Sequence, residues 1–438
     1  MSTELSPDKK YSPEEFWASR PLFRNIKWWA SYTVKSPYAI LVWAMVQMLS
    51  RIPYDSYYVT KTGKNALNMT FVVSGDTGTG KTAARHLAYS GDIFTFDGHY
   101  WYEAPLVQLR SGESAGDAFF TRIKKSVDDK NEEWVDEWIN LNRAIIFFFD
   151  EVLYFVGKQR QNSSTLVAVL LSMWSGEMLG GALAGGKGKT VPAKEYRACV
   201  VLNSQKETDA FRGDSSAYSG ESSRILTVSA VNPLAETDHG AVQGMEPPKP
   251  VVVPKFGGYG DRMSPQFRAL PEMEAAQAQQ DFLAHKGLND RTRSHEILQR
   301  SKIACVLAAL DGRTHLTLED WHLALHLIEH SRAVDTEIRS AQNKALRSEA
   351  GKSGAILGVK MDAADTSKEQ AAIERVAKNL RKHAPEAGYL LEMPPSTPEN
   401  VAAVKKLATL ITSRDRDHVT PALTLIYNEL INAQKEEK

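Results

Sequence analysis

The chain has 438 residues, and its 53 lysines and arginines are balanced by 53 aspartates and glutamates. This length predicts two or three domains, and 42% hydrophobic with 24% charged residues is a globular composition that excludes wholesale disorder and collagen-like or disulfide-rich architectures. Because the net charge is zero, any contact with nucleic acid or an anionic membrane must come from a local patch.

Cysteine usage and the first residues indicate the compartment. Cys199 and Cys305 both lie in apolar runs, which excludes a disulfide framework or a Cys-rich zinc site and indicates a reducing compartment. The first ten residues lack the features of a secretory signal. The apolar stretch at 38–49 is broken by Gln47 and is shorter than the roughly 20 residues of a bilayer span. We therefore expect a cytoplasmic protein without membrane contact.

Residues 11–52 are predicted to be helical. Ser12 is a suitable N-cap, Pro13 suits the first turn, and Glu14 and Glu15 favour a helix N-terminus. Apolar residues follow at intervals along this stretch. We assign residues 1–66 to an N-terminal helical segment.

From about residue 70 the pattern changes to short apolar runs bounded by Gly, Asp or Ser. Such runs are typical of strands that are buried on both faces, and helical stretches lie between them. Alternating strands and helices predict a parallel sheet covered on both sides, within a core domain at 67–230. The predicted strands are 69–73, 106–109, 144–149, 198–202 and 225–228.

The remaining chain is predicted to be a linker followed by helices. Residues 231–271 are rich in Pro and Gly and have no helical period, so we expect a linker or a long surface excursion. A helical domain at 272–348 contains one helix at 294–311, ending at Gly312, and a second that starts with a capping box at Thr317 and runs to about 338. After a soft stretch at 350–366, a C-terminal domain at 367–438 is predicted, with helices at 367–382, 398–411 and 413–431.

A phosphate-binding motif, G-x-x-x-x-G-K-T, lies between the first predicted strand and the helix-compatible residues 83–87. Its glycines let successive N–H groups point at phosphates, and the N-terminus of the following helix favours an anion. The lysine would reach the β- and γ-phosphates, and the threonine hydroxyl would ligate Mg²⁺. The motif predicts binding of ATP with Mg²⁺ by residues Gly75, Asp76, Thr77, Gly78, Thr79, Gly80, Lys81 and Thr82.

The predicted strand at 144–149 ends in two carboxylates, Asp150 and Glu151. Asp150 can hold Mg²⁺ through water, and Glu151 is placed to polarise the water that attacks the γ-phosphate. On its own, a pair of carboxylates after an apolar strand is weak evidence of a site, because such pairs often simply begin a loop. Together with the phosphate loop it predicts a site that hydrolyses ATP.

The chain resembles the P-loop ATPases of phages, plasmids and integrated elements, which are grouped with primase-helicase and replicative-helicase proteins of the AAA+ type. The resemblance covers most of residues 14–340, and besides the phosphate loop it rests on short motifs in a shared order. It implies an α/β P-loop NTPase core of AAA+ type at 67–230, a helical lid at 272–348 and a winged-helix-like domain at 367–438. The motifs are Glu15-Phe16-Trp17, Arg20-Pro21, Ser36-Pro37, Leu67-Asn68, Ser111-Gly112-Glu113, Ser164-Thr165-Leu166, Trp174-Ser175-Gly176-Glu177, Tyr196-Arg197, and Asp311-Gly312-Arg313 with Asp320-Trp321.

The resemblance also implies roles for single residues. Asn203, at the tip of the strand after the Asp-Glu strand, matches the polar residue that positions the attacking water, although an Asn there can also simply cap a turn. Arg224 resembles the arginine finger inserted into a neighbouring subunit's site, although an ordinary surface arginine is equally compatible. Glu113 fills the slot that carries the catalytic glutamate in RecA-like motors, so it is the alternative to Glu151.

Two segments are candidates for DNA contact. Residues 180–191 are predicted to form a hairpin with Lys187 and Lys189 at its tip, which by resemblance would track DNA phosphates in a pore; a flexible basic surface loop is the alternative. The stretch 401–430 resembles a helix-turn-helix with Arg414, Arg416 and His418 facing outward, although an oligomerisation bundle explains the same pattern.

Together with these features, the resemblance implies a ring-forming, hexameric motor that moves along DNA during replication of a mobile element. Partners would be single-stranded or forked DNA, other copies of the chain, and a primase or other replication proteins. Two alternatives stay open: a helicase loader that remodels another protein, and a nucleotide-regulated DNA-binding initiator.

Overall fold

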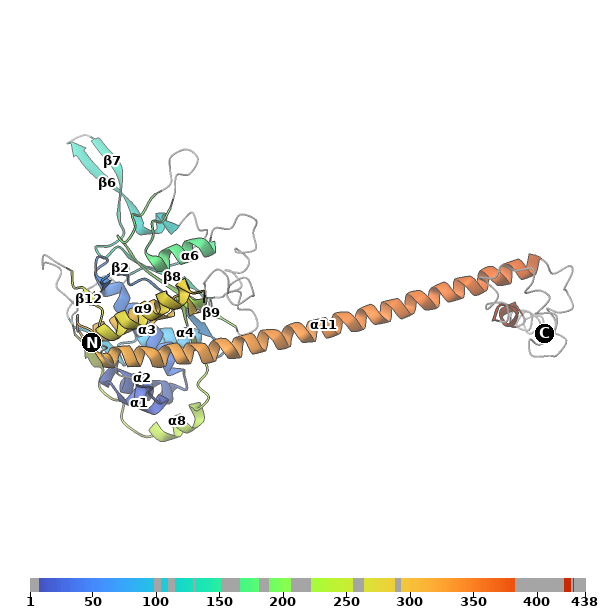
Figure 1. Cartoon of the computed structure of the whole chain (residues 1–438), viewed down its shortest axis with the longest axis horizontal. Coiled ribbons are helices and arrows are strands. Elements are labelled where there is room, and N and C mark those ends of the chain that lie inside the picture. The colour runs from blue at the N-terminus through green and yellow to red at the C-terminus, as the bar shows by residue number, and fades with distance from the viewer. Residues whose placement is uncertain are drawn as a thin grey trace. The chain divides into compact units, whose positions relative to one another are not determined.

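The computed structural model describes residues 8–97, 104–108, 115–128, 131–150, 166–180, 189–205, 222–254, 264–287, 293–382, 421–426 and 428 (Figure 1). The chain divides into two compact units, Met1–Asn343 and Lys344–Lys438. No helix among the described residues is long and apolar enough to cross a bilayer.

A five-stranded parallel sheet forms the centre of the first unit. All five predicted strands are present, and they lie in the order β10-β3-β9-β8-β5. The α/β class and the parallel sheet are thus confirmed. In this register Ser74 pairs with both Ser204 and Ser229, so the carboxyl ends of three adjacent strands are level. The strands are β3 (Met69–Ser74), β5 (Leu106–Val107), β8 (Ala144–Phe149), β9 (Arg197–Ser204) and β10 (Ile225–Ser229).

Side chains alternate between two buried layers along each strand. In β9, Cys199 and Val201 belong to one apolar cluster, whereas Ala198, Val200 and Leu202 belong to another on the opposite face. Successive strand residues point to opposite faces, so a strand covered on both sides becomes a continuous apolar run. This explains why the apolar runs predicted the strands.

The N-terminal segment, expected to be helical over 11–52, forms three helices. Each helix begins with a proline, which suits the first turn but disfavours helix in the residue before it. Pro21 and Pro37 therefore separate the three helices from one another. The predicted Ser12 cap is confirmed as a capping box with Glu15. The helices are α1 (Pro13–Ala18), α2 (Pro21–Thr33) and α3 (Pro37–Arg51).

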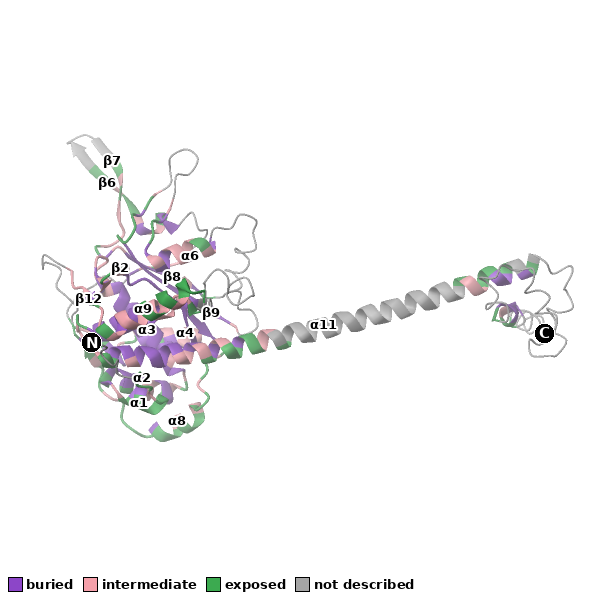
Figure 2. Ribbon diagram, viewed as in Figure 1, coloured by how far each residue is buried: buried purple, intermediate pink, exposed green. Residues whose placement is uncertain are grey.

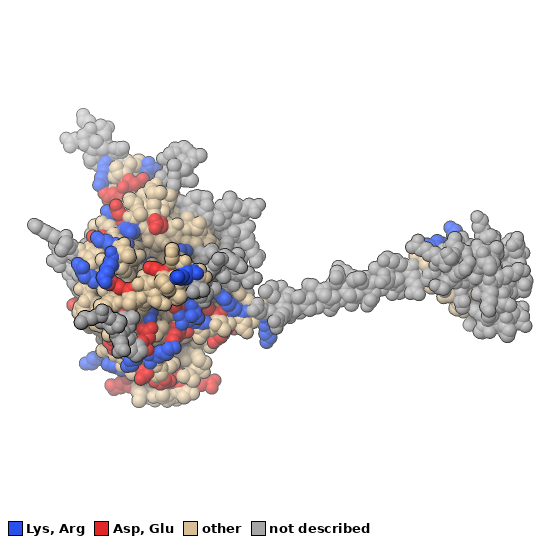
Figure 3. Space-filling model, viewed as in Figure 1, with Lys and Arg blue, Asp and Glu red and all other residues tan. Residues whose placement is uncertain are grey.

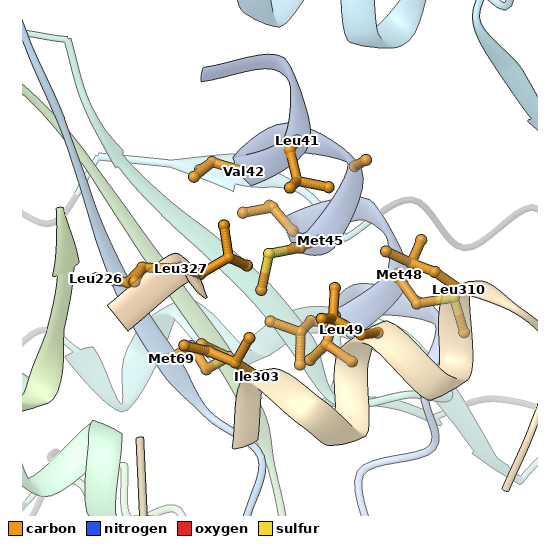
Figure 4. Close-up of a cluster of buried hydrophobic side chains, with 14 of the residues drawn as sticks. Leu41, Val42, Met45, Met48, Leu49, Met69, Leu226, Ile303, Leu310 and Leu327 are labelled. Atoms are coloured by element: carbon orange, nitrogen blue, oxygen red, sulfur yellow. The ribbon is translucent and has the colours of Figure 1, made fainter. Parts of the chain in front are cut away.

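Helix α3 covers one face of the sheet. Leu41, Met45 and Leu49 pack into a cluster with Met69 of β3 and with Ile303 of α10 (Glu296–Leu310), as Figure 4 shows. Thirteen of the fifteen residues of α3 are buried (Figure 2). The N-terminal helices therefore belong to the core of the first unit. The opposite face is covered by α6 (Leu166–Ser175) and a short 3₁₀ turn, η2 (Asp117–Phe119).

A two-stranded antiparallel ribbon lies between the second and third strands of the sheet in sequence, where helix was expected. It consists of β6 (Phe120–Asp128) and β7 (Asn131–Trp138). Trp134 and Trp138 are four residues apart, a spacing typical of a helix, but both lie on β7, and Trp134 is 52% exposed. Ion pairs such as Lys125–Glu137 join the two strands, so charged residues interrupt the apolar pattern that marks a buried strand.

The region expected to be a linker, 231–271, contains regular structure. Helix α8 (Ala235–Val242) contacts α2, and β11 (Val251–Val253) pairs in parallel with β4 (Phe94–Phe96). Strand β12 (Phe267–Arg268) pairs with β1 (Tyr57–Thr60), which in turn pairs with β2 (Gly63–Ala66). Val253 and Phe267 are fully buried, so this segment packs on the core at both points.

Three helices follow. Helix α9 (Pro271–His285) precedes α10, and α11 (Leu318–Lys382) begins at the predicted capping box. The expected end near 338 and the soft stretch at 350–366 are wrong, because α11 is helical throughout. In the second unit, Val376, Ala377 and Leu380 of α11 are buried, as are Ala422, Leu423 and Ile426. The predicted helix at 398–411 and residues 414–418 lie outside the described residues, so the winged helix stays a prediction.

Candidate phosphate-binding site

The glycine-rich loop at 75–80 connects β3 to helix α4 (Lys81–Tyr89), as its motif predicts. Both neighbouring strands fix its beginning: the Gly75 N–H donates to the Ser204 carbonyl at 3.0 Å, and the Ala230 N–H donates to the Ser74 carbonyl at 2.7 Å. The loop therefore starts from a rigid point at the carboxyl edge of the sheet.

Glycine is required at Gly75 and Gly80 for different reasons. A Cβ on Gly75 would lie 2.7 Å from the Thr79 hydroxyl and 2.9 Å from the Ala230 Cβ, so the loop closes too tightly for a side chain. Gly80 has φ +86°, in the left-handed region, and is the residue before the first turn of α4. This conformation turns the chain from the loop into the helix, whose first N–H groups have no intrahelical partners and favour an anion.

The Lys81 ammonium is held over the loop. Its Nζ donates to the Gly75 carbonyl and, at 3.0 Å, to the Asp76 carbonyl. The Thr79 hydroxyl donates to the same Asp76 carbonyl at 2.8 Å. A cation thus lies beside the N-terminus of α4, and both features favour a phosphate at this point.

The three side chains predicted around Mg²⁺ and water lie together at the carboxyl edge of the sheet. The Thr82 hydroxyl lies 3.3 Å from Oδ1 of Asp150, the residue that follows β8. The Asn203 Nδ2 donates to the same carboxylate oxygen at 2.8 Å. Asn203 is 2% exposed, and its Oδ1 is buried without a hydrogen-bond partner, so it can accept a hydrogen bond from a water.

These oxygen donors fit a hard divalent cation. Mg²⁺ usually takes one or two carboxylates, several waters and phosphate oxygens, and a dedicated all-protein cage is unusual. Among the described residues there is no group of three or more His, Cys, Asp or Glu side chains that could hold a metal. Thr82 and Asp150 would therefore hold Mg²⁺ only together with a bound phosphate and water.

Two further side chains reach the loop that were not assigned to the site from the sequence. The Gln205 Nε2 donates to the Thr77 hydroxyl at 3.1 Å. Lys35, between α2 and α3, lies against Gly80. The position of Gln205 directly after a strand was a usable signal, but no pattern connects Lys35 with a loop 45 residues away.

The structure does not bring every predicted residue to this site. Glu151, Glu113 and Lys187 lie outside the described residues. Arg224 precedes β10 and so lies at the amino ends of the strands, with its guanidinium 5.5 Å from the Trp174 ring centroid. Lys189 forms an ion pair of 2.7 Å with Asp136 of the ribbon. The ends of the predicted 180–191 hairpin are joined by an antiparallel bridge between Leu179 and Val191.

Charged side chains of both signs are mixed over the face of the first unit drawn in Figure 3. This agrees with the zero net charge of the chain. A search of protein-family models and of curated proteins found no match to this chain.

Proposed function

We propose that this chain binds ATP together with Mg²⁺ and hydrolyses it. One observation carries the proposal: the phosphate loop, the Thr82–Asp150 pair and the unsatisfied Asn203 Oδ1 all lie at the carboxyl ends of the adjacent strands β3, β8 and β9. The carboxyl edge of an open parallel sheet is where ligands bind in this class of fold.

Each residue would have one task. The N–H groups of the loop and of the first turn of α4 would bind the β- and γ-phosphates, and Lys81 would exchange its loop carbonyls for phosphate oxygens. Thr82 and Asp150 would hold Mg²⁺, which neutralises charge on the phosphates when it is bound. Asn203 would orient the attacking water through its Oδ1.

In the proposed reaction a water oxygen bonds to the γ-phosphorus while the bond from that phosphorus to the β–γ bridging oxygen breaks. The bridging oxygen keeps the electron pair and leaves with ADP, and a carboxylate takes the proton from the water. We propose Glu151 as this base, since it follows Asp150 directly, and Glu113 as the alternative.

The test is binding and turnover by the purified full-length chain. We expect isothermal titration calorimetry to show Mg²⁺-dependent ATP binding, and phosphate release to follow. Glu151→Gln should bind ATP as the wild type does and lose turnover, while Glu113→Gln should retain it. Turnover that survives in Glu151→Gln would overturn the choice of base. Absence of ATP binding by the wild type would overturn the proposed function.

A narrower proposal is that hydrolysis drives a ring of subunits along DNA. Arg224 supports it, because it lies at the amino ends of the strands, away from its own phosphate loop at their carboxyl ends, as a residue that acts on a neighbour's nucleotide would. We expect single-stranded DNA to stimulate ATP turnover, and Arg224→Ala to reduce turnover without reducing ATP binding. Stimulation by a protein partner alone would favour a loader, and DNA binding without stimulated turnover would favour an initiator.

A further inference from the structure

The connector between α2 and α3 contains a strained residue. Val34 adopts φ +56° and ψ +49° at the C-cap of α2. A β-branched side chain is disfavoured in this left-handed region, where glycine is usual. The strain is maintained by hydrogen bonds at the helix end, including one of 2.8 Å from the Lys35 N–H to the Ala30 carbonyl. The local structure therefore fixes the direction in which the chain leaves α2.

The other end of the connector is fixed to the edge of the sheet. The Ser36 hydroxyl donates to the Ser229 carbonyl at the end of β10 and accepts from the Ala39 N–H at 3.4 Å. Ser36 is buried, and Ser229 pairs with Ser74, the residue before the phosphate loop. The connector is thus attached to the same strand ends that hold the loop.

Between these two anchors, the Lys35 side chain lies along Gly80. A Cβ placed on Gly80 would be 2.8 Å from the Lys35 Cδ and 3.1 Å from its Nζ. Lys35 is half-buried, and the part of the chain that the structure describes gives its ammonium neither an ion pair nor a hydrogen bond. A lysine held against the loop whose ammonium has no counter-ion among the described residues is favourably placed for an anionic ligand.

We propose that Lys35 is a second phosphate-binding lysine of this site, outside the phosphate-loop motif. Lys35 and Lys81 would approach the polyphosphate from two different elements, the α2–α3 connector and the N-terminus of α4. The N-terminal helices would thereby contact the bound nucleotide directly. This inference rests on the proposed function, because it needs a polyphosphate at the loop.

The strain at Val34 has a role under this proposal. Local strain is retained where the surrounding structure needs a specific geometry, and here that geometry directs the Lys35 stem onto Gly80. Glycine at position 34 would relieve the strain and leave the connector more freedom. Val34→Gly should then hold Lys35 less firmly, while the protein itself is at least as stable as the wild type.

The test compares nucleotide affinities of charge-removing and charge-keeping variants by isothermal titration calorimetry. Lys35→Met keeps an apolar stem against Gly80 but has no charge, and we expect it to bind ATP and ADP about tenfold more weakly. Lys35→Arg should stay within about threefold of the wild type, since it keeps the cation. Lys64→Met, an exposed lysine of β2, is the matched control and should bind as the wild type does.

The outcomes separate this inference from the proposed function. Wild-type affinity in Lys35→Met, together with weakened binding in Lys81→Ala, would overturn the role of Lys35 and leave the ATP site intact. No ATP binding by the wild type would overturn both. Thermal unfolding without nucleotide should be the same for Lys35→Met and Lys35→Arg. If Lys35→Met weakens binding only by unfolding the protein, the two unfolding curves will differ, and the role proposed for Lys35 is then wrong.

Discussion

At the amino ends of its strands the central sheet buries two cations completely, whereas at the carboxyl ends its charged side chains reach solvent. Arg197 begins β9 and is fully buried, and its Nη2 donates to the carbonyls of Pro53, Tyr54 and Ser56. Lys302 is also fully buried, and its Nζ donates to the carbonyls of Asn68 and Trp174 at 3.0 and 2.6 Å.

Burial lowers the pKa values of the two cations at the amino ends. It lowers the pKa of Arg197 to about 10, and it lowers the pKa of Lys302 well below its ordinary value, with the charges of Arg197 and Arg224 adding to the effect on Lys302. At the carboxyl ends, Asp150 is exposed, Lys81 is half-buried and the Asn203 Oδ1 has no partner. The Nε and Nη1 of Arg197 are also buried without a partner, so the two ends differ in exposure. Fully buried cations serve folding, and charged groups that reach solvent are available to a ligand.

The largest expected effect is on stability, from Lys302→Ala. The variant would leave a cavity under the Trp174 ring, whose centroid lies 3.6 Å from the ammonium, and two buried carbonyls without their donor. We expect the free energy of unfolding to fall by about 3–5 kcal/mol, measured by urea denaturation. ATP affinity of the folded fraction should not change. A free energy of unfolding within about 1 kcal/mol of the wild-type value would show that the buried Lys302 does not stabilise the fold as proposed.

The reciprocal variant at the carboxyl end is Lys81→Ala. It removes a half-buried cation whose described hydrogen-bond partners include two carbonyls of a loop. We expect ATP to bind about 100-fold more weakly, while the free energy of unfolding stays within about 0.5 kcal/mol of the wild type. Calorimetry and urea denaturation on one preparation measure both. If the variant is less stable but binds ATP as the wild type does, Lys81 serves folding and not ligand binding.

Asp150→Asn tests the metal at the same end. The substitution places an amide of the same size as the carboxylate next to Thr82 and Asn203, and it removes the charge that would attract Mg²⁺. We expect ATP affinity with Mg²⁺ to fall by about tenfold and affinity in EDTA to stay close to that of the wild type. An equal loss under both conditions would mean that Asp150 acts on the loop itself and not through the metal.

The smallest expected effect is a pH dependence from His295, at the amino end. Burial, followed by the charges of Arg224 and Lys302, lowers the pKa of His295 to about 4 from 6.5. As the pH falls from about 6.5 to 4, the unfolded chain takes up this proton before the folded chain does, so stability decreases across this window. His295→Gln should flatten this part of the curve in denaturation series at several pH values. If the free energy of unfolding of His295→Gln depends on pH as that of the wild type does, another group causes the dependence.

The carboxyl end of the sheet could be predicted from the sequence because its chemistry follows its strands. Asp150 and Asn203 lie at the ends of apolar runs, Thr82 closes the motif that follows another such run, and parallel strands bring these positions to one edge. The amino end offered no such signal. Arg197 and Lys302 lie in stretches whose neighbours are apolar, and their carbonyl partners come from segments distant in sequence.

The other failures also have physical causes. Strands β11 and β12 have only three and two residues, too few to show a period, so the segment around them resembled a linker. The ribbon was missed because its strands pair charges where buried strands have apolar residues. The prolines at 21 and 37 mark where the helical stretch expected at 11–52 divides into separate helices.

Helix α3 has a consequence for where this protein can be truncated. It covers Phe71, Val73 and Val201 on one face of the sheet, and Ser36 at its start is bonded to the end of β10. A chain begun at residue 67, just before the first strand of the core, would keep the whole phosphate-loop motif but expose that face of the sheet to water. Truncated proteins meant to retain the nucleotide site must begin before α1. Recombination that exchanged the first 50 residues would replace part of the core of the protein.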